Sequence, residues 1–415
     1  MTALQQQGQA AKAATYVLAT AGTAKKNAAL NAIADVLTER QAEWLSANAE
    51  DVAAAKEAGM RPAMLDRLTL TPERVAGIVD GVRQVAALPD PIGKVDKMET
   101  RPNGLIIGRR RVPLGVIAII FEARPNVTVD AAALCLKSGN VCILRGGKEA
   151  IRSNRCVAEL MRQALASVGL PEDCISLVQD TSHDTANELM HLDGYVDVLI
   201  PRGGAGLIRA VAKEASVPVI RTGEGVCHIY IDDEADLDMG ASILFNAKCS
   251  RPSVCNAVEC VLVHRDVAAD FWKKALPALD EKGVELRADG EALEILGTRA
   301  VPAEEADWDA EYDDYILAVK TVGGMDEAIG FINDHGTQHS EAIITRNYFK
   351  AQHFLDRVDA AAVYVNASTR FTDGGEFGLG AEIGISTQKM HARGPMGLEE
   401  LTSCKYVIYG EGQVR

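Results

Sequence analysis

Short apolar runs alternate with helix-like stretches from residue 115 onward, and this alternation restricts the possible folds more than any other feature of the sequence. Regular alternation of strands and helices produces right-handed βαβ units around a parallel sheet. The sequence therefore predicts an α/β fold. The strands predicted in this first series are VIAIIF (116–121), VCILR (141–145), ISLVQ (175–179), VDVLI (196–200) and VPVI (217–220), with helices at about 128–138, 148–167, 183–191 and from 205.

A second α/β series begins near residue 227, so we place a domain boundary near residue 225. A chain of 415 residues is long for one hydrophobic core and suits two domains. We expect residues 280–312, which are polar and acidic, to cross the surface with little core of their own. The second series comprises CHIYI (227–231), AVECVLVH (257–264), YILAVK (315–320), EAIITR (341–346) and AAVYVN (361–366).

Three segments lie outside the two series. Residues 27–58 have apolar residues at helical spacing, which predicts a largely helical first third. Residues 95–112 contain a Pro-Asn-Gly turn between possible strands, which is typical of a hairpin. The last dozen residues, with KYVIYGEGQ, also predict a strand. Because isolated hairpins are rarely stable, we expect these strands to form a homo-oligomer interface.

Charge and composition exclude several classes of partner. The formal net charge of -15 gives no electrostatic support for binding nucleic acid or an anionic membrane. No apolar run approaches the roughly 20 residues of a membrane helix, and the N-terminus lacks the pattern of a signal peptide. Nine scattered cysteines without a CxxC pair suit a reducing cytoplasm, and the dispersed histidines offer no metal site. We expect a soluble, cytoplasmic protein without a metal.

Paired glycines follow two neighbouring predicted strands, in LRGGKEA (144–150) and IPRGGAG (200–206). Backbone N–H groups and the helix dipole make such a turn an anion site, as in folds that bind dinucleotides. Neither turn matches GxGxxG, and paired glycines also permit tight turns without any ligand. The residues alone leave both interpretations open.

The stretch NAKCSRPSVCNAVE (246–259) contains the best candidate for a nucleophile. Cys255 lies between a predicted helix and a predicted strand, where Pro252 ends the helix and leaves the thiol accessible. Lys248 and Arg251 provide the electropositive surroundings that a thiolate needs. Cys260 lies within the strand and Cys249 nearer the helix, so both are expected to pack. On its chemistry alone, Cys255 is either a nucleophile or a structural thiol.

Six segments resemble the aldehyde dehydrogenase superfamily, and within it the gamma-glutamyl phosphate reductase family. The resemblance covers residues 10–412 and implies an aldehyde dehydrogenase-like fold. It implies a Rossmann-like cofactor-binding domain (1–225) with an oligomerisation hairpin at about 95–113, a catalytic domain (226–365), and a return segment (366–415) that completes the cleft and the oligomerisation tail. The segments are VPLGVIAIIFEARPN (112–126), LKSGNVCILRGGKEA (136–150), VLIPRGGAGLI (198–208), NAKCSRPSVCNAVE, EYDDYILAVK (311–320) and RGPMGLEELTSCKYVIYG (393–410).

This resemblance implies NADPH-dependent reduction of L-glutamyl 5-phosphate to L-glutamate 5-semialdehyde, the second step of proline biosynthesis from glutamate. Cys255 matches the family's nucleophile, which would form a thioester and release phosphate. The Cys255 backbone N–H and the Asn256 amide are candidates to hold the oxyanion. The implied partners are the small substrate, a dimer or tetramer of this chain, and transiently glutamate 5-kinase. An NAD(P)-dependent aldehyde-oxidising dehydrogenase and a non-enzymatic nucleotide-binding regulator remain alternatives.

The resemblance also assigns binding residues. Arg145 and Lys148 would meet the 2'-phosphate of NADP, a guanidinium offering bidentate contacts. Glu311 would bind the nicotinamide ribose. The remaining cofactor residues are Gly146, Gly203 and Gly204, of which the latter two match the pyrophosphate turn. Substrate anions would meet Arg124, Arg251, Asn366, Ser368, Thr369 and Arg370.

Two positions depart from the hydrolytic aldehyde dehydrogenases. Ala123 replaces their asparagine, and Arg221 stands near the position of the glutamate that activates the deacylating water. The loss of that base suits a thioester that must survive until hydride arrives. Glu224 lies close enough in sequence to leave the presence of a carboxylate base open.

Overall fold

The chain divides into two compact units in a computed structural model that describes the backbone of residues 1–415 and every side chain except those of residues 63 and 205. Unit 1 comprises Met1–Thr222, Gly378–Gly384 and Met396–Arg415; unit 2 comprises Gly223–Phe377 and Ile385–Pro395. The sequence placed a boundary near 225 and a return segment from 366 onward. The observed division falls after residue 222, and residues 366–377 group with unit 2.

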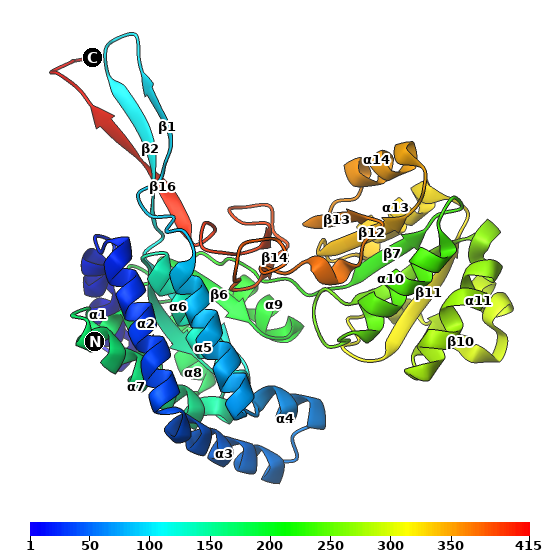
Figure 1. The fold of residues 1–415 in the computed structure, drawn as a ribbon, viewed down its shortest axis with the longest axis horizontal. Helices are drawn as coiled ribbons and strands as arrows, with labels where there is room; N and C mark the ends of the chain where they lie inside the picture. Colours follow the sequence, from blue (N-terminus) through cyan, green and yellow to red (C-terminus); the bar gives the residue numbers. More distant parts are fainter. The chain divides into compact units, whose positions relative to one another are not determined.

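A four-stranded parallel sheet in the order β5-β4-β3-β6 forms the centre of unit 1 (Figure 1). Strands buried on both faces favour the Val- and Ile-rich runs seen here. The strands are β3 (Val116–Phe121), β4 (Val141–Arg145), β5 (Ile175–Leu177) and β6 (Val198–Arg202). The predicted strand at 217–220 is wrong: it is reduced to a bridge between Leu199 and Val219, since Pro218 has no N–H to continue a ladder.

Helices cover this sheet and form most of the first third of the chain, as predicted. Pro125 at the first turn of α6 and the Ser182 side chain at the start of α8 favour helix initiation at these points. The helices of unit 1 are α1 (Ala3–Leu18), α2 (Thr23–Glu39), α3 (Gln41–Glu57), α4 (Pro62–Leu68), α5 (Pro72–Ala87), α6 (Pro125–Lys137), α7 (Ile151–Ser167), α8 (His183–Met190) and α9 (Ala205–Glu214), with 3-10 turns η1 (Lys148–Ala150) and η2 (Glu172–Cys174).

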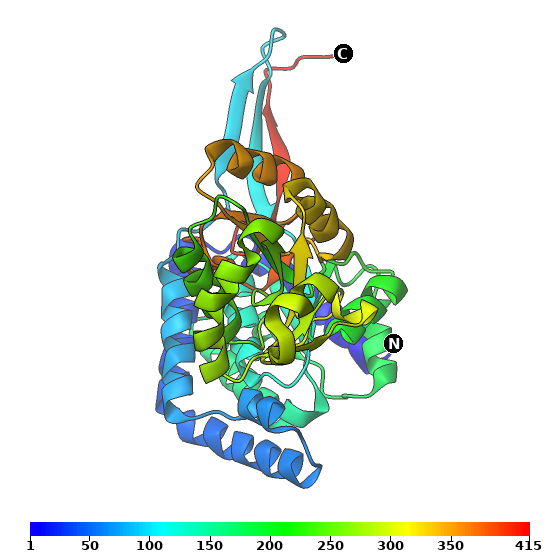
Figure 2. The same ribbon diagram turned by 90° about the vertical axis from the view of Figure 1, so that its right-hand side faces the viewer.

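The predicted hairpin and C-terminal strand form a separate antiparallel sheet in the order β1-β2-β16. The strands are β1 (Val95–Thr100), β2 (Ile106–Pro113) and β16 (Thr402–Tyr409). The register runs from Thr402 opposite Pro113 to Tyr409 opposite Ile106. All of β1 is exposed, and Figures 1 and 2 show no helix covering the far end of this sheet.

A seven-stranded parallel sheet in the order β10-β9-β11-β8-β7-β12-β13 forms unit 2. Its strands are β7 (Cys227–Ile231), β8 (Val258–His264), β9 (Glu285–Ala288), β10 (Ala300–Pro302), β11 (Ile316–Val322), β12 (Ser340–Ile344) and β13 (Ala362–Val365). Its helices are α10 (Leu237–Cys249), α11 (Arg265–Glu281), α12 (Gly290–Leu296), α13 (Met325–His335) and α14 (Tyr348–Arg357). Shorter elements are η3 (Gly297–Arg299), η4 (Glu305–Asp307), η5 (Thr369–Phe371) and the paired strands β14 (Ile385–Ser386) and β15 (Gly394–Pro395).

The expectation that residues 280–312 have little core of their own is wrong. This segment contributes β9, α12 and β10, and Leu286 and Ala292 are fully buried in the main cluster of unit 2. In the described part of the chain, no helix is both long and apolar enough to cross a membrane.

Candidate active site

Cys255 lies in the loop of residues 250–257, which connects α10 to β8 in unit 2; we call this segment the Cys255 loop. Its thiol is partly exposed, whereas Cys249 and Cys260 are buried, and none of the three forms a disulfide. A Cβ on Gly225 would fall 1.5 Å from the Cys255 carbonyl oxygen, so glycine is required for this close approach. Cys227 also donates its thiol to that oxygen, at 3.2 Å. The backbone of Cys255 is therefore held from two sides.

Glu311 lies beside the same loop. Its Oε1 atom accepts a hydrogen bond of 3.0 Å from the Gly225 backbone N–H, and Gly225 in turn packs against Cys255. The structure thus brings together the predicted nucleophile and one predicted cofactor residue within unit 2.

The Asn256 side chain, which was predicted to hold the oxyanion, forms hydrogen bonds within unit 2. The residue is 5% exposed, and its Nδ2 atom donates to the carbonyl oxygens of Arg370 at 3.2 Å and Thr372 at 3.0 Å. Its Oδ1 atom accepts a hydrogen bond from the Arg370 guanidinium. Because both amide hydrogens are used internally, this side chain fastens η5 to the Cys255 loop and is not available to an oxyanion.

Three further residues that were predicted to bind substrate form hydrogen bonds within unit 2. Thr369 is fully buried and donates to the Asn256 carbonyl oxygen at 2.7 Å, and the buried Ser368 side chain accepts from the Arg370 N–H. Asn366 has a left-handed backbone with φ 57, and its amide bonds both the N–H and the carbonyl of Thr345. These side chains therefore stabilise the loops of unit 2, and their role in binding substrate stays a prediction.

Two predicted arginines remain as cationic groups near Cys255. Arg251 is exposed, whereas Arg370 is half-buried and donates from Nε to the Ser250 hydroxyl at 3.1 Å. Burial lowers the pKa of the Arg370 guanidinium, and the neighbouring charge of Arg251 acts in the same direction while Cys255 opposes it. An anion placed here would relieve the repulsion between the two guanidiniums. Arg124, the third predicted arginine, is exposed in unit 1 at the start of α6.

A buried polar chain under the Cys255 loop was not predicted from the sequence. His339 Nδ1 lies 2.9 Å from the Ser340 hydroxyl and 3.7 Å from the Cys227 sulfur. The Ser340 hydroxyl contacts the Thr372 hydroxyl at 2.6 Å, and Thr372 contacts the Tyr364 hydroxyl at 2.7 Å. Burial lowers the pKa of His339 to about 4, so this histidine is neutral near pH 7. In the sequence, His339 and Ser340 are neighbours, but no local pattern shows that both side chains are buried and joined to Thr372.

In unit 1, the predicted cofactor residues follow the carboxyl ends of β4 and β6. Gly203 and Gly204 are exposed just before α9, and the Gly204 N–H donates to Glu122 Oε2 at 2.9 Å. Lys148 is exposed in η1. These positions are those at which parallel α/β sheets bind phosphate groups. Glu122 was not predicted from the sequence, and its carboxylate accepts the hydrogen bond from the Gly204 N–H at the start of α9.

Arg145 and Gly146 are less open to a ligand than predicted. Arg145 is half-buried and donates from Nη2 to the Thr181 and Ser182 carbonyl oxygens, at 2.7 and 3.1 Å, and burial lowers its pKa. A Cβ on Gly146 would fall 2.2 Å from Asn154 Nδ2, so this glycine serves close packing.

The site nevertheless suits an anionic dinucleotide in its chemistry, because donors without a partner in the described part of the chain lie beside the glycine turn that follows β4. The buried Nε atom of Arg145 and the buried Nδ2 atom of Asn154 have no hydrogen-bond partner among the described residues. Together with exposed Lys148 and the glycine turn, they match phosphate and ribose oxygens in chemistry.

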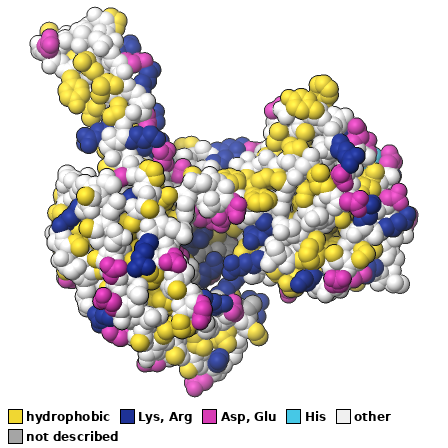
Figure 3. Space-filling model, viewed as in Figure 1, with side chains coloured by type: hydrophobic (Ala, Val, Ile, Leu, Met, Phe, Trp, Pro, Cys, Tyr) yellow, Lys and Arg dark blue, Asp and Glu magenta, His cyan; other side chains and the backbone are white. Residues whose placement is uncertain are grey.

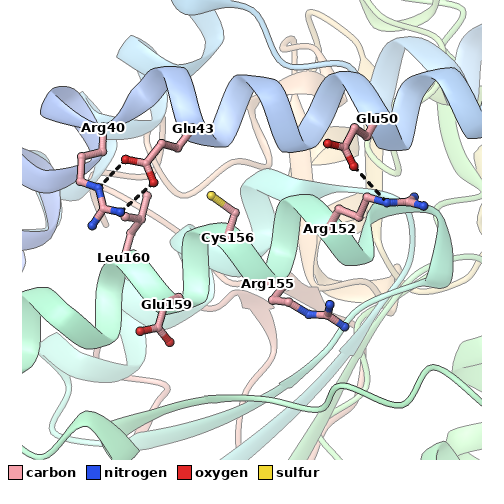
Figure 4. A pocket seen from close by; sticks show the side chains of 8 residues that line it. All are labelled: Arg40, Glu43, Glu50, Arg152, Arg155, Cys156, Glu159 and Leu160. Atoms are coloured by element: carbon pink, nitrogen blue, oxygen red, sulfur yellow. Dashed lines mark hydrogen bonds and ion pairs between the residues drawn. The ribbon is translucent and has the colours of Figure 1, made fainter.

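A pocket of about 330 Å³ lies elsewhere in unit 1, between α3 and α7 (Figure 4). Four of its charged residues form two ion pairs, with Arg40 and Glu43 2.6 Å apart and Arg152 and Glu50 3.3 Å apart. Arg155 and Glu159 hydrogen-bond to the neutral side chains of Gln179 and Gln163. None of the predicted site residues lines this pocket, so it is not the candidate site.

Comparison with known proteins defines the class first. The model of the aldehyde dehydrogenase family matches residues 2–291, which places the chain in that family. A gamma-glutamyl phosphate reductase of Clostridium perfringens (strain SM101 / Type A) is 59% identical over 98% of both chains. That of Enterococcus faecalis is 57% identical over 100% of this chain and 99% of the relative.

A solved structure agrees with these relatives. The gamma-glutamyl phosphate reductase of Thermotoga maritima is 46% identical, covers 100% of both chains and superposes with a TM-score of 0.97. The chain belongs to the gamma-glutamyl phosphate reductase family, an oxidoreductase branch of the aldehyde dehydrogenases. This confirms the resemblance and the α/β fold class inferred from the sequence.

Proposed function

We propose that the protein reduces L-glutamyl 5-phosphate to L-glutamate 5-semialdehyde with NADPH and releases phosphate, as the second step of proline biosynthesis. The observation that carries this proposal is the partly exposed Cys255 thiol, held by Gly225 and Cys227 beside the guanidiniums of Arg251 and Arg370. A fixed nucleophile next to paired cations suits an acyl phosphate, which is electrophilic and anionic.

The Cys255 thiolate attacks the acyl carbon of the substrate. A C–S bond forms, the C–O bond to phosphate breaks, and the phosphate leaves with its electron pair. Arg251 and Arg370 neutralise the anionic groups of the substrate during this step. The Cys255 backbone N–H holds the developing oxyanion, the Asn256 amide being committed to η5.

The resulting thioester is then reduced. When bound, NADPH would supply a hydride to the thioester carbon. The hemithioacetal alkoxide on Cys255 would then re-form the C=O bond as the C–S bond breaks, which releases the aldehyde and the Cys255 thiolate. Glu311 orients the nicotinamide ribose from beside the loop, and Gly225 keeps Glu311 and Cys255 in one arrangement.

Unit 1, taken by itself, contains further residues that we propose for the cofactor. The Gly203 and Gly204 N–H groups meet the pyrophosphate once Glu122 releases the start of α9. Lys148 and the unpartnered Nε of Arg145 meet the 2'-phosphate, which favours NADP over NAD.

The reverse reaction tests the assignment. Glutamate semialdehyde and NADP are mixed with and without inorganic phosphate, and formation of the reduced nicotinamide is followed by absorbance. Strict dependence on phosphate is expected, because phosphate must resolve the thioester. Phosphate-independent reduction of NADP would mean that water resolves it, and the protein would then be an ordinary aldehyde-oxidising dehydrogenase.

We also propose that the sheet β1-β2-β16 forms a homo-oligomer interface. Met98, Ile106, Tyr406, Ile408 and Tyr409 are 38–70% exposed on it, and Figure 3 shows hydrophobic side chains gathered on this sheet. Exposed apolar clusters on strands favour association. A Tyr406→Glu, Ile408→Lys variant should sediment as a smaller species than the parent; an unchanged sedimentation coefficient would exclude this interface. Contact with glutamate 5-kinase would be sought by the same method in a mixture of both proteins.

A further inference from the structure

A buried ion pair joins the two ends of the Cys255 loop. Lys248 lies in the last turn of α10 and Glu259 lies on β8, and their side chains are 0% and 1% exposed. Lys248 Nζ and Glu259 Oε2 are 2.6 Å apart. Transfer of two charges out of water is unfavourable, and their attraction often fails to compensate. Stabilisation of the fold alone is therefore a weak explanation for an ion pair at the two ends of the Cys255 loop.

The pair contacts the segment that carries Glu311 as well as the Cys255 loop. Lys248 Nζ lies 5.7 Å from the centroid of the Tyr312 ring, a distance typical of a cation–π contact. Tyr312 follows Glu311 directly and is itself fixed, because its hydroxyl donates to Asp307 Oδ1 at 2.8 Å. Lys248 thus lies against both segments that meet at Gly225.

The charge of Glu259 also interacts with the charges of the segment that carries Glu311. Burial raises the pKa of Glu259, Lys248 opposes this shift by stabilising the carboxylate, and the charges of Glu311 and Asp313 add to the shift. The second carboxylate oxygen of Glu259, Oε1, is buried and accepts no hydrogen bond from the described residues. Lys248 is consequently the group that balances the Glu259 charge, and loss of Lys248 would expose Glu259 to repulsion from Glu311.

We infer that Lys248 and Glu259 are positioning residues that hold the Cys255 loop and the Glu311 segment in the arrangement required for reaction. This inference rests on the proposed role of Cys255 as the nucleophile. Neither residue touches the reacting atoms. Both act through the backbone that presents Cys255 and through the Glu311 carboxylate.

The experiment compares Lys248→Met, the double variant Lys248→Met with Glu259→Met, and Lys26→Met. The double variant removes both charges at similar volume, which typically preserves folding where a single change leaves a buried charge unpaired. Lys26→Met is the control, because Lys26 and Asp90 also form a buried pair in unit 1, with a distance of 2.7 Å and exposures of 1% and 8%. Folding is checked by circular dichroism and thermal midpoint.

Two functional readouts are measured on each variant. The first is the rate of iodoacetamide alkylation of Cys255 against pH, followed by mass spectrometry of the Cys255 peptide in the absence of substrates. The second is kcat and KM of the phosphate-dependent reverse reaction. We expect a folded double variant with a shifted alkylation profile and kcat lowered about 10- to 100-fold at nearly constant KM. The control should retain the parent profile.

Each outcome decides the inference. A folded double variant with the parent's alkylation profile and kcat would overturn it and leave the pair a stabilising contact only. If Lys248→Met fails to fold, the double variant still decides. If alkylation of Cys255 in the parent leaves activity intact, the proposed function fails instead, and this result is independent of the variants.

Discussion

The Cys255 loop and the glycine turns of unit 1 both connect a strand with a helix and both carry polar groups predicted to bind a ligand. They differ in how many of these polar groups already have a hydrogen-bond partner within the protein. At the Cys255 loop, the side chains of Asn256 and of Thr369 in η5 form hydrogen bonds with backbone carbonyl groups, and Gly225 packs against Cys255. In the unit 1 turns, Gly203, Gly204 and Lys148 are exposed, and a single carboxylate satisfies the Gly204 N–H. One region is fixed by internal bonds, and the other leaves donors for a ligand.

This difference follows from the tasks proposed for the two regions. Covalent chemistry needs the reacting atoms in one place before the substrate arrives, and a displacement of about 1 Å can lower the rate a hundredfold. A bound cofactor can instead supply its own oxygens to complete the hydrogen bonds of a turn. Substitutions in the first region should change rate and stability, and those in the second should change affinity.

The largest effect is expected for Cys255→Ala. Without the thiol no thioester forms, so kcat/KM of the phosphate-dependent reverse reaction should fall about 10³-fold or more. Cys249→Ala is the matched control, since Cys249 is 5% exposed at the end of α10 and should leave the rate within a few-fold of the parent. Equal activity of both variants would mean that the Cys255 loop carries no chemistry.

A second prediction concerns pH and the stability of unit 2. His339 has a folded-state pKa of about 4, below the 6.5 of an exposed histidine. Between these two pH values, the histidine is protonated in the unfolded chain and neutral in the folded chain. Stability therefore falls on acidification between pH 6.5 and 4, and is unaffected by this group above pH 6.5. Between pH 7 and 5 the loss is about 2 kcal/mol.

Urea unfolding of unit 2, followed by the fluorescence of Trp272 and Trp308, measures this loss. His339→Gln should reduce the difference between pH 7 and pH 5 by about 2 kcal/mol, whereas His191→Gln, at an exposed position, should not. The same pH dependence of the unfolding free energy in both variants would show that burial of His339 does not contribute to it.

A third prediction separates the two arginines. Arg251→Gln should raise KM for phosphate about tenfold without altering the thermal midpoint, because the side chain is exposed. Arg370→Gln should raise KM similarly and also lower stability, because Asn256 Oδ1 loses its charged donor. Equal thermal midpoints in the two variants would contradict the framework role of Arg370.

The smallest effect is expected in the open region. Glu122→Gln removes a negative charge from the start of α9, so NADPH should bind about two- to fivefold more tightly. Titration of NADPH fluorescence measures the affinity, and Glu159→Gln, which lines the pocket between α3 and α7, serves as control. Weaker binding by the Glu122 variant would mean that this carboxylate helps the cofactor instead of competing with it.

The sheet cores could be predicted because buried parallel strands leave continuous apolar runs, as in Val116–Phe121. The strands β9 and β10 could not. They have four and three residues, and Glu285 and Arg287 interrupt the apolar pattern, since they lie toward the edge of the sheet where only one side is covered. In such short polar segments, pairing with the neighbouring strands of the sheet outweighs the low intrinsic β-strand propensity of the residues.

For the site, the position of Cys255 was predictable from its neighbours, because Pro252 and the flanking elements define a loop. The uses of Asn256, Ser368 and Thr369 were not. Thr369 bonds the Asn256 carbonyl across 113 residues of sequence, and no local pattern reveals whether an amide or hydroxyl is already committed to such a partner. The polar residue types were recognised, but their availability depends on tertiary contacts.

The pairing of β2 with β16 has a consequence for synthesis of the chain. Residues 402–409, which complete the sheet beside β2, emerge from the ribosome only after all of unit 2 has been made. Until then the β1–β2 hairpin has an open edge with apolar side chains, a state in which strands tend to aggregate. Translation pauses or truncations ahead of residue 402 should therefore expose this edge to chaperones and proteases, even though both parallel sheets have already been translated.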